Sequence, residues 1–303
     1  MTNVGDEHQA PGTPRPPRAP APGAVRTCSF LTDYGLQDGF VGACRGVIAT
    51  IAPGVVVIDI SHLVPPQDVR RGAAVLADTV PSLPPGTVHI AVVDPGVGTA
   101  RRPVAVATAR GDLLVGPDNG LLPPAAEALG GVVAAHTLTN PELMAASPSS
   151  TFHGRDVFAP VAAHLALGVG LADTGPAIDP ADLVRLPVPR CRLDSAAGLA
   201  EGEVVTVDRF GNVQTSLGQQ MLLALGLRPG QRLRLRVGAE PGGGEVPYAT
   251  TFGEVPRGAL VGFVDSSGRF ALAVNGGSAE ARLGLSPGDP VTVTASSTGN
   301  CPE

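Results

Sequence analysis

Apolar runs and segments with helical spacing alternate along the first half of the chain. Runs rich in apolar residues at 27–31, 55–60 and 88–93 are predicted to be strands, and the run at 88–93 is apolar and β-branched enough to be a buried one. Residues 40–51 and 68–80 carry apolar side chains at helical spacing and are delimited by proline or glycine. The order strand, helix, strand, helix, strand predicts an α/β domain with a mainly parallel central sheet.

The same region continues with a predicted hairpin and two further helices. Residues 104–108 and 113–115 have strand character, and Arg110-Gly111-Asp112 between them has turn chemistry. Residues 123–129 and 157–167 have helical spacing.

After residue 187 the pattern changes to short strands between glycine-rich turns. Strands are predicted at 203–207, 232–237, 259–264, 270–274 and 291–294, with a helix only at 279–283. Such a run predicts a smaller all-β, barrel-like domain. The change falls in the proline-rich stretch LPVPRC, so we predict domains at 26–188 and 189–303 after a tail at 1–25.

Composition excludes several classes of protein. The 303 residues are 43% hydrophobic with a formal net charge of −6, and the arginines are scattered, so we expect a globular protein that binds no nucleic acid. Residues 1–25 are rich in proline, alanine and glycine, which predicts disorder, and lack the apolar core of a secretory signal. No segment reaches the roughly 18 apolar residues of a membrane span. We expect a soluble, cytoplasmic protein.

Lysine and cysteine usage limit the chemistry further. All 21 basic residues are arginine, which excludes a Schiff-base or P-loop lysine. The four cysteines, Cys28, Cys44, Cys191 and Cys301, are far apart and form no CxxC pair. We therefore predict no metal site and expect a reducing compartment.

The segment VVDPGVGTAR, residues 92–101, places an acid and an arginine in one loop after a predicted strand. Pro95 and Gly96 supply turn geometry. The loop opens at the carboxyl end of a strand, where open α/β sheets bind ligands. Asp94 and Arg101 are candidate catalytic residues; the alternative is a structural turn in which Asp94 caps its own backbone.

The segment TFHGRD precedes the predicted helix at 157–167. His153 could hold or move a proton near neutral pH, and Phe152 could stack on a purine. In the structural alternative Asp156 is the helix N-cap, Phe152 belongs to the core and His153 has no role.

Other polar turns could bind a ligand or only shape the chain. Asp33, in TDYG, could accept ribose hydroxyls or cap a turn. Asp208 and Asn212, in DRFGN, could grip an ammonium group or close a hairpin. Ser266 and Ser267, in DSSG, could cradle a carboxylate, although a hairpin connection explains the same composition.

The ordered set TDYG, DISH, DPGVGTAR, PDNG, FHGRD, DRFGN and DSSG…AVNGG resembles a known family. It is similar to the S-adenosyl-L-methionine (SAM) hydroxide adenosyltransferases, adenosine-forming SAM hydrolases related to enzymes that fluorinate or chlorinate SAM. The resemblance covers about residues 25–293. It implies a homotrimer with SAM between one subunit's N-terminal domain and its neighbour's C-terminal domain. It also implies that water attacks the ribose C5′, with SAM as substrate and no cofactor.

The resemblance further implies a role for each matching residue. The catalytic triad falls on Asp94, Arg101 and His153. The methionine and ribose would be held by Asp33 at the ribose, Asp208 at the ammonium group, and Ser266 and Ser267 at the carboxylate. The adenine would meet Asn212 and the backbone of Asn275 and Gly276, between Phe152 and Phe252.

Two alternatives are a halide-dependent SAM halogenase and a non-catalytic SAM or adenosine sensor. Halogenating relatives carry a tyrosine where this chain has Asp94, another residue in place of His153, and a longer span between Arg101 and His153. They also carry an aromatic residue at the position of Gln67. The triad residues therefore favour water as the nucleophile, and a sensor has no use for them.

Overall fold

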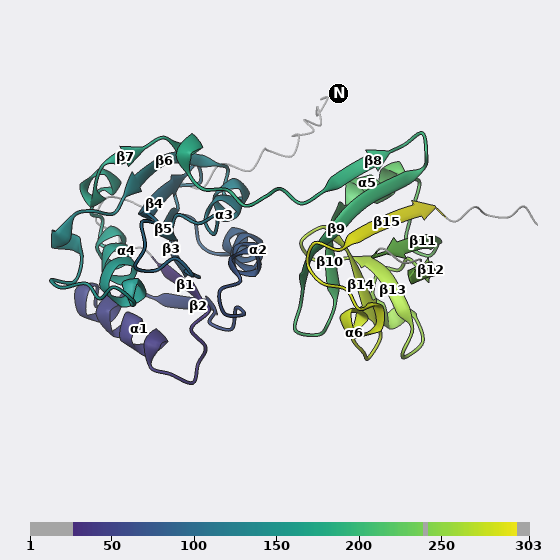
Figure 1. Cartoon of the computed structure of the whole chain (residues 1–303), viewed down its shortest axis with the longest axis horizontal. Coiled ribbons are helices and arrows are strands. Elements are labelled where there is room, and N and C mark those ends of the chain that lie inside the picture. Colours follow the sequence, from purple (N-terminus) through teal and green to yellow (C-terminus); the bar gives the residue numbers. More distant parts are fainter. Residues whose placement is uncertain (1–26, 239–241, 296–303) are drawn as a thin grey trace, which may run out of the picture. The chain divides into compact units, whose positions relative to one another are not determined.

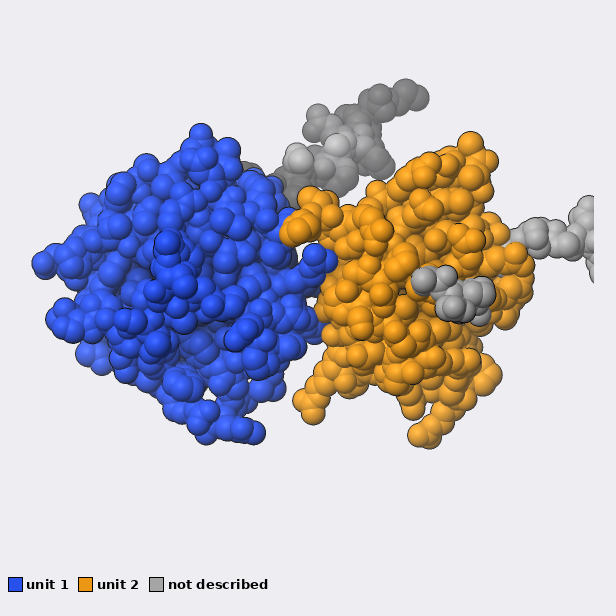
Figure 2. Space-filling model, viewed as in Figure 1, with its two compact units in different colours: residues 1–186 blue, residues 187–303 orange. Residues whose placement is uncertain are grey.

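The computed structural model describes residues 27–238 and 242–295, which form two compact units divided between Leu186 and Pro187. Figure 1 labels the elements and Figure 2 colours the two units separately. The predicted tail at 1–25 and Cys301 lie outside the described residues. Within the described part of the chain, no helix is long and apolar enough to cross a membrane.

The first unit contains a seven-stranded sheet in the order β2-β1-β3-β5-β4-β6-β7. Its strands are β1 (Cys28–Thr32), β2 (Val57–Ser61), β3 (Val88–Val92), β4 (Pro103–Thr108), β5 (Leu113–Pro117), β6 (Val132–Thr137) and β7 (Ala177–Ile178). The strands β2, β1, β3 and β5 pair in parallel, whereas β4, β6 and β7 add an antiparallel half. The carboxyl ends of β1, β2 and β3 therefore lie at the same edge.

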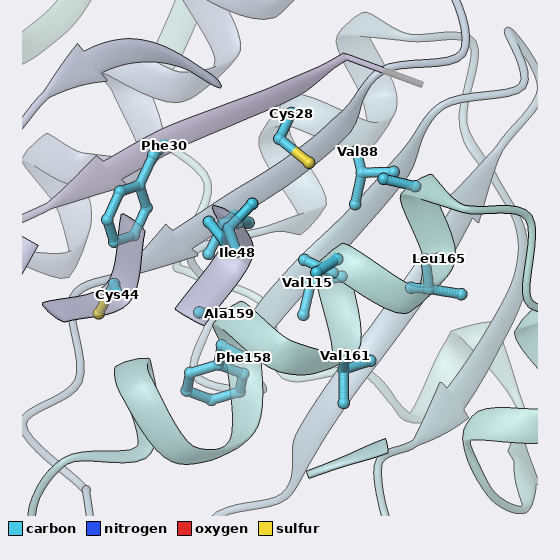
Figure 3. Close-up of a cluster of buried hydrophobic side chains, with 14 of the residues drawn as sticks. Cys28, Phe30, Cys44, Ile48, Val88, Val115, Phe158, Ala159, Val161 and Leu165 are labelled. Carbon is cyan, nitrogen blue, oxygen red and sulfur yellow. The ribbon is translucent and has the colours of Figure 1, made fainter. Parts of the chain in front are cut away.

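Helices cover both faces of this sheet. Helices α1 (Phe40–Ile51) and α4 (Ala159–Ala166) pack on one face, and α2 (Val69–Thr79) and α3 (Pro123–Ala128) on the other. Side chains alternate along each strand, so Phe30 enters the α1/α4 core and Leu31 the α2/α3 core. Figure 3 shows the first of these cores, where Phe30, Ile48 and Phe158 are buried together.

The second unit is a nearly closed antiparallel barrel in the order β12-β11-β15-β9-β10-β14-β13, with β8 paired to β9. Its elements are β8 (Cys191–Asp194), β9 (Leu199–Val207), β10 (Val213–Gly218), α5 (Gln219–Ala224), β11 (Arg232–Val237), β12 (Gly242–Pro247), β13 (Leu260–Val264), β14 (Arg269–Val274), α6 (Ala279–Leu283) and β15 (Pro290–Ala295). A bridge between Tyr248 and Gly262 brings the two outer strands together.

The predicted fold class, an α/β domain followed by an all-β barrel-like domain, is confirmed. The pattern missed β6, β7, β8, β10 and β12, and the expectation of a single helix after residue 187 was wrong because α5 is also present. Strand β6 reads VVAAHT and β12 begins with three glycines. Alanine and glycine are poor strand formers, so pairing with neighbours determines these strands.

The cysteines form no disulfide among the described residues. Cys28 and Cys44 are buried in the α1/α4 core and Cys191 is exposed, and all three are free. Burial raises the pKa of the Cys28 and Cys44 thiols to about 12, so both remain protonated. The described residues contain no cluster of histidine, cysteine and carboxylate side chains that could hold a metal ion.

Candidate active site

The loop after β3 folds back so that Arg101 binds Asp94. Nε of Arg101 donates to both carboxylate oxygens of Asp94 at 2.9 Å, and Nη2 donates to Oδ2. The two side chains are only 9% and 6% exposed. The carboxylate of Asp94 therefore engages a guanidinium group, and the alternative of a purely structural turn does not describe its side chain. A bidentate pair of this kind fixes the orientation of both groups.

His153 extends this pair into a chain of three residues. Its Nδ1 lies 2.9 Å from Nη2 of Arg101. An arginine is always protonated and can only donate, so Nδ1 of His153 accepts. The neutral imidazole then carries its proton on Nε2. His153 is therefore held by Arg101.

Burial and charge both favour the neutral form of His153. Desolvation lowers its pKa below the ordinary value of 6.5, and the guanidinium of Arg101 lowers it further. The carboxylates of Asp94 and Asp156 oppose this shift without reversing it.

A π-helical turn positions His153. Residues Gly154–Phe158 form this turn between His153 and α4, and Ala159 donates from its backbone to the carbonyl of Gly154. Such turns are rare and are frequent at functional sites. The structural alternative in which Asp156 is the helix N-cap is wrong, because the turn begins two residues earlier, at Gly154. Asp156 instead accepts from the Ser149 backbone at 2.8 Å and pairs with Arg155.

Glycine permits the loops around the candidate residues to approach one another. Gly98 has a φ of +78°, and a Cβ there would lie 2.6 Å from the carbonyl oxygen of Ser150. At Gly154, a Cβ would lie 2.1 Å from the hydroxyl oxygen of Tyr34. Any larger residue at either position would push the loop after β3, or the loop after β1, away from His153.

Asp33 lies in the loop after β1, and its Oδ2 accepts a hydrogen bond from the Gln67 backbone at 2.8 Å. The neighbouring Tyr34 belongs to an aromatic cluster with Phe40 and Phe152. The ring centroids of Phe152 lie 5.9 Å from Tyr34 and 5.2 Å from Phe40. The first unit thus joins the Asp33 loop to the segment that carries His153.

Phe152 is only partly buried. Its ring packs against the α1/α4 core, and the guanidinium of Arg155 lies 4.9 Å from its centroid. A hollow of about 450 Å³ beside α1 is lined by Arg155 and Asp156 but by none of the triad residues. This hollow is therefore separate from the candidate catalytic groups.

In the second unit, Asp208 and Asn212 close the β9–β10 hairpin. Oδ1 of Asp208 accepts from the backbones of Phe210 and Asn212, and Nδ2 of Asn212 donates to Oδ2 at 2.7 Å. The hairpin alternative is thus correct for the local structure, and the two side chains remain adjacent as a polar pair. The turn contacts the segment after β14, since Glu280 donates from its backbone to the Gly211 carbonyl.

The other predicted substrate-binding residues of this unit also lie in turns. Asn275 and Gly276 follow β14, and Nδ2 of Asn275 donates to the Val255 carbonyl at 2.7 Å. Ser266 and Ser267 precede β14, in the β13–β14 hairpin, and Ser267 donates to Asp265 at 2.7 Å. They therefore lie at the opposite end of β14 from Asn275. Phe252 is 51% exposed, with its ring 6.2 Å from that of Phe263.

The DISH and PDNG motifs carried no predicted role. Nδ1 of His62, in DISH, lies 2.9 Å from Oγ1 of Thr32, the first residue of TDYG. Asn119 donates from Nδ2 to the Val93 carbonyl at 2.8 Å, directly before Asp94, and its Oδ1 accepts from the Leu121 backbone. Asn119 thus supports the end of β3. Only the position of these motifs after neighbouring strands could have signalled such contacts.

An α/β sheet with an Asp–Arg–His chain at the carboxyl ends of its parallel strands, followed by an antiparallel barrel, defines a class of two-domain enzyme. The model of the SAM hydroxide adenosyltransferase N-terminal domain matches residues 28–175, and that of the C-terminal domain matches residues 202–292. The chain belongs to this family.

Individual relatives agree with this assignment. The chain is 58% identical to the (R)-S-adenosyl-L-methionine hydrolase of Salinispora arenicola over 267 residues, covering 88% of this chain and 97% of the relative. It is 31% identical to a fluorinase of Actinoplanes sp., over 88% and 96% of the two chains. A crystal structure of an uncharacterized conserved protein from Thermotoga maritima matches with a TM-score of 0.82 and 38% identity, over 88% of this chain and all of that one.

Proposed function

We propose that this protein hydrolyses (R)-S-adenosyl-L-methionine to adenosine and L-methionine. The observation that carries the proposal is the hydrogen-bonded chain from Asp94 through Arg101 to His153, in a chain that is 58% identical to a hydrolase of that name. The fluorinase relative is more distant, at 31% identity.

The reaction requires a bound water molecule rather than a strong base. The oxygen of water forms a bond to C5′ while the C5′–S bond breaks. The electron pair of the C5′–S bond leaves with sulfur, which becomes the neutral thioether of methionine. The water loses one proton. Because the sulfonium is already a good leaving group, orienting the water at C5′ is the main task of the protein. A halide would need no proton acceptor, whereas water does.

Asp94 is the residue that takes this proton. Nδ1 of His153 is occupied by Arg101, and Nε2 of the neutral ring already carries hydrogen, so His153 donates to the water oxygen instead of accepting from it. The carboxylate of Asp94 keeps free lone pairs beside its bonds to Arg101. Arg101 fixes the positions of the Asp94 carboxylate and the His153 ring relative to each other.

The substrate roles follow the family resemblance. Asp33 binds the ribose hydroxyls, Asp208 the ammonium group, and Ser266 and Ser267 the carboxylate of methionine. Asn212 and the backbone of Asn275 and Gly276 bind the adenine between Phe152 and Phe252. These residues come from both units, and we propose a cytoplasmic homotrimer in which each site combines the first unit of one subunit with the second unit of its neighbour.

Product analysis tests the proposal. Purified protein incubated with SAM should form adenosine and methionine in equal amounts, and Asp94→Asn should reduce the rate by about 10²-fold or more, as expected when a proton acceptor is removed. Asp173→Asn, an aspartate outside the site, is the matched control. A 5′-halo-deoxyadenosine product in the presence of chloride or fluoride would instead identify a halogenase, and tight binding without turnover would identify a sensor.

A further inference from the structure

His62 and Thr32 connect the loops that follow the neighbouring parallel strands β1 and β2. Nδ1 of His62 lies 2.9 Å from Oγ1 of Thr32, the last residue of β1, and the carbonyl of His62 accepts from the Gly35 backbone at 2.8 Å. We call these two contacts the His62 bridge. Thr32 and Gly35 lie on either side of Asp33 in the chain, so the two contacts fix the backbone before and after Asp33.

The His62 bridge is buried. His62 is 3% exposed and Thr32 is fully buried. Nε2 of His62 lies 3.2 Å from Oδ1 of Asp59 without a hydrogen bond between them. Nδ1 of His62 and the Thr32 hydroxyl are hydrogen-bond partners. Oγ1 of Thr32 in turn accepts from the Tyr34 backbone at 3.2 Å.

The loop after β2 also binds the carboxylate itself. The backbone of Gln67 donates to Oδ2 of Asp33 at 2.8 Å, and Gln67 has a φ of +66°. A non-glycine residue in this region is strained and persists only where its surroundings hold it. The loop thus adopts an unfavourable backbone geometry at the residue that aims an N–H at Asp33.

We propose that Thr32 and His62 are positioning residues that fix the Asp33 carboxylate for the ribose hydroxyls of the substrate. This inference rests on the proposed role of Asp33 in the SAM hydrolase. Neither residue touches the substrate. Their effect is on ribose affinity, transmitted through the loop of Asp33, and it should vanish for a ligand that has no hydroxyls at C2′ and C3′.

Equilibrium binding of adenosine and of 2′,3′-dideoxyadenosine tests this inference by calorimetry. Thr32→Val, which keeps the shape of the side chain and removes the hydroxyl, should weaken adenosine binding about tenfold, the effect of weakening a hydrogen bond to a charged group. It should leave dideoxyadenosine binding within about twofold. Thr32→Ser, which keeps both hydrogen bonds, should restore adenosine binding.

Thr87→Val is the matched control. Thr87 is equally buried in the same unit, and its hydroxyl donates to the Pro84 carbonyl at 2.6 Å, at the amino end of β3. This variant should lose stability without a change in either affinity. If Thr32→Val does not fold, His62→Gln is the second variant, because it removes the ring nitrogen that faces Thr32. It should weaken adenosine binding relative to dideoxyadenosine binding by the same factor.

Two results would overturn the inference: unchanged adenosine affinity in both variants, or an equal loss for both nucleosides. Absence of adenosine binding by the wild-type protein would overturn it as well. The proposed function fails separately, if the wild-type protein binds adenosine but forms none from SAM.

Discussion

Arg101 is the residue on which the proposed site depends, because its guanidinium binds Asp94 and His153 at once. Sequence reasoning placed these three residues in one site through the family resemblance, but it left open which of Asp94 and His153 takes the proton. The answer depends on which ring nitrogen faces the arginine. Arg101 and His153 are 52 positions apart in the chain, and the orientation of their side chains cannot be derived from their spacing in the sequence.

At this scale the account predicts an acid limb in the pH profile. Burial and Arg101 lower the pKa of His153, so the ring stays neutral below the ordinary value of 6.5. Protonation of Nδ1 at lower pH would replace its bond to Arg101 with repulsion. We therefore expect kcat/KM to be constant above this pKa and to fall by about tenfold per pH unit below it.

The predicted acid limb is checked by measuring kcat/KM of the wild-type protein and of His153→Gln between about pH 4.5 and 9. The variant should be slower and should lack this limb. An unchanged limb in His153→Gln would assign it to another group, and activity that rises as the pH falls through the limb would contradict a neutral His153.

The loops at the carboxyl ends of β1, β2 and β3 determine the site at the scale of elements. The apolar runs predicted these three strands closely, because each contains several apolar residues in succession, and β1 and β3 are buried along their whole length. The contacts between their loops were not predictable in the same way. The His62 bridge joins residues 30 apart, and it follows from the pairing of β1 with β2.

Gly98→Ala tests the close approach of two of these segments. Its Cβ would clash with the Ser150 carbonyl, so the loop that carries Arg101 must move away from His153. We expect kcat/KM to fall by about 10²-fold, as a displacement of about 1 Å can cause.

Gly54→Ala is the control, since Gly54 has a φ of +92° but nothing within 4 Å of a Cβ. Both substitutions carry the backbone strain of a left-handed conformation, and only Gly98→Ala should affect the rate. Equal losses of activity in the two variants would show that the strain, and not the clash, is responsible.

The whole molecule combines an α/β unit that holds the triad, Asp33 and Phe152 with a barrel unit that holds the remaining predicted binding residues. The change of pattern after residue 187 and the glycine-rich turns were enough to predict this organisation. The strands rich in alanine, glycine or polar residues, such as β10 and β12, were not predicted, because barrel pairing rather than local sequence determines them. The assembly of the units into a shared site remains a proposal.

Complementation between two inactive variants tests that assembly. Asp94→Asn disables the first unit and Asp208→Asn the second. In every mixed trimer, one of the three sites should join two intact units, so co-refolded or co-expressed variants should recover activity that neither has alone. Co-assembly is verified with two affinity tags. Mixed trimers without recovered activity would mean that each site lies within a single chain, and an active wild-type monomer would refute a shared site.

The central claim is that water attacks C5′ of SAM at the Asp94–Arg101–His153 site. Turnover in water labelled with the heavy isotope of oxygen, followed by mass spectrometry of both products, tests it most directly. The account predicts one heavy oxygen atom in the 5′-hydroxyl of adenosine and none in methionine. Unlabelled adenosine, or 5′-methylthioadenosine as the nucleoside product, would contradict it.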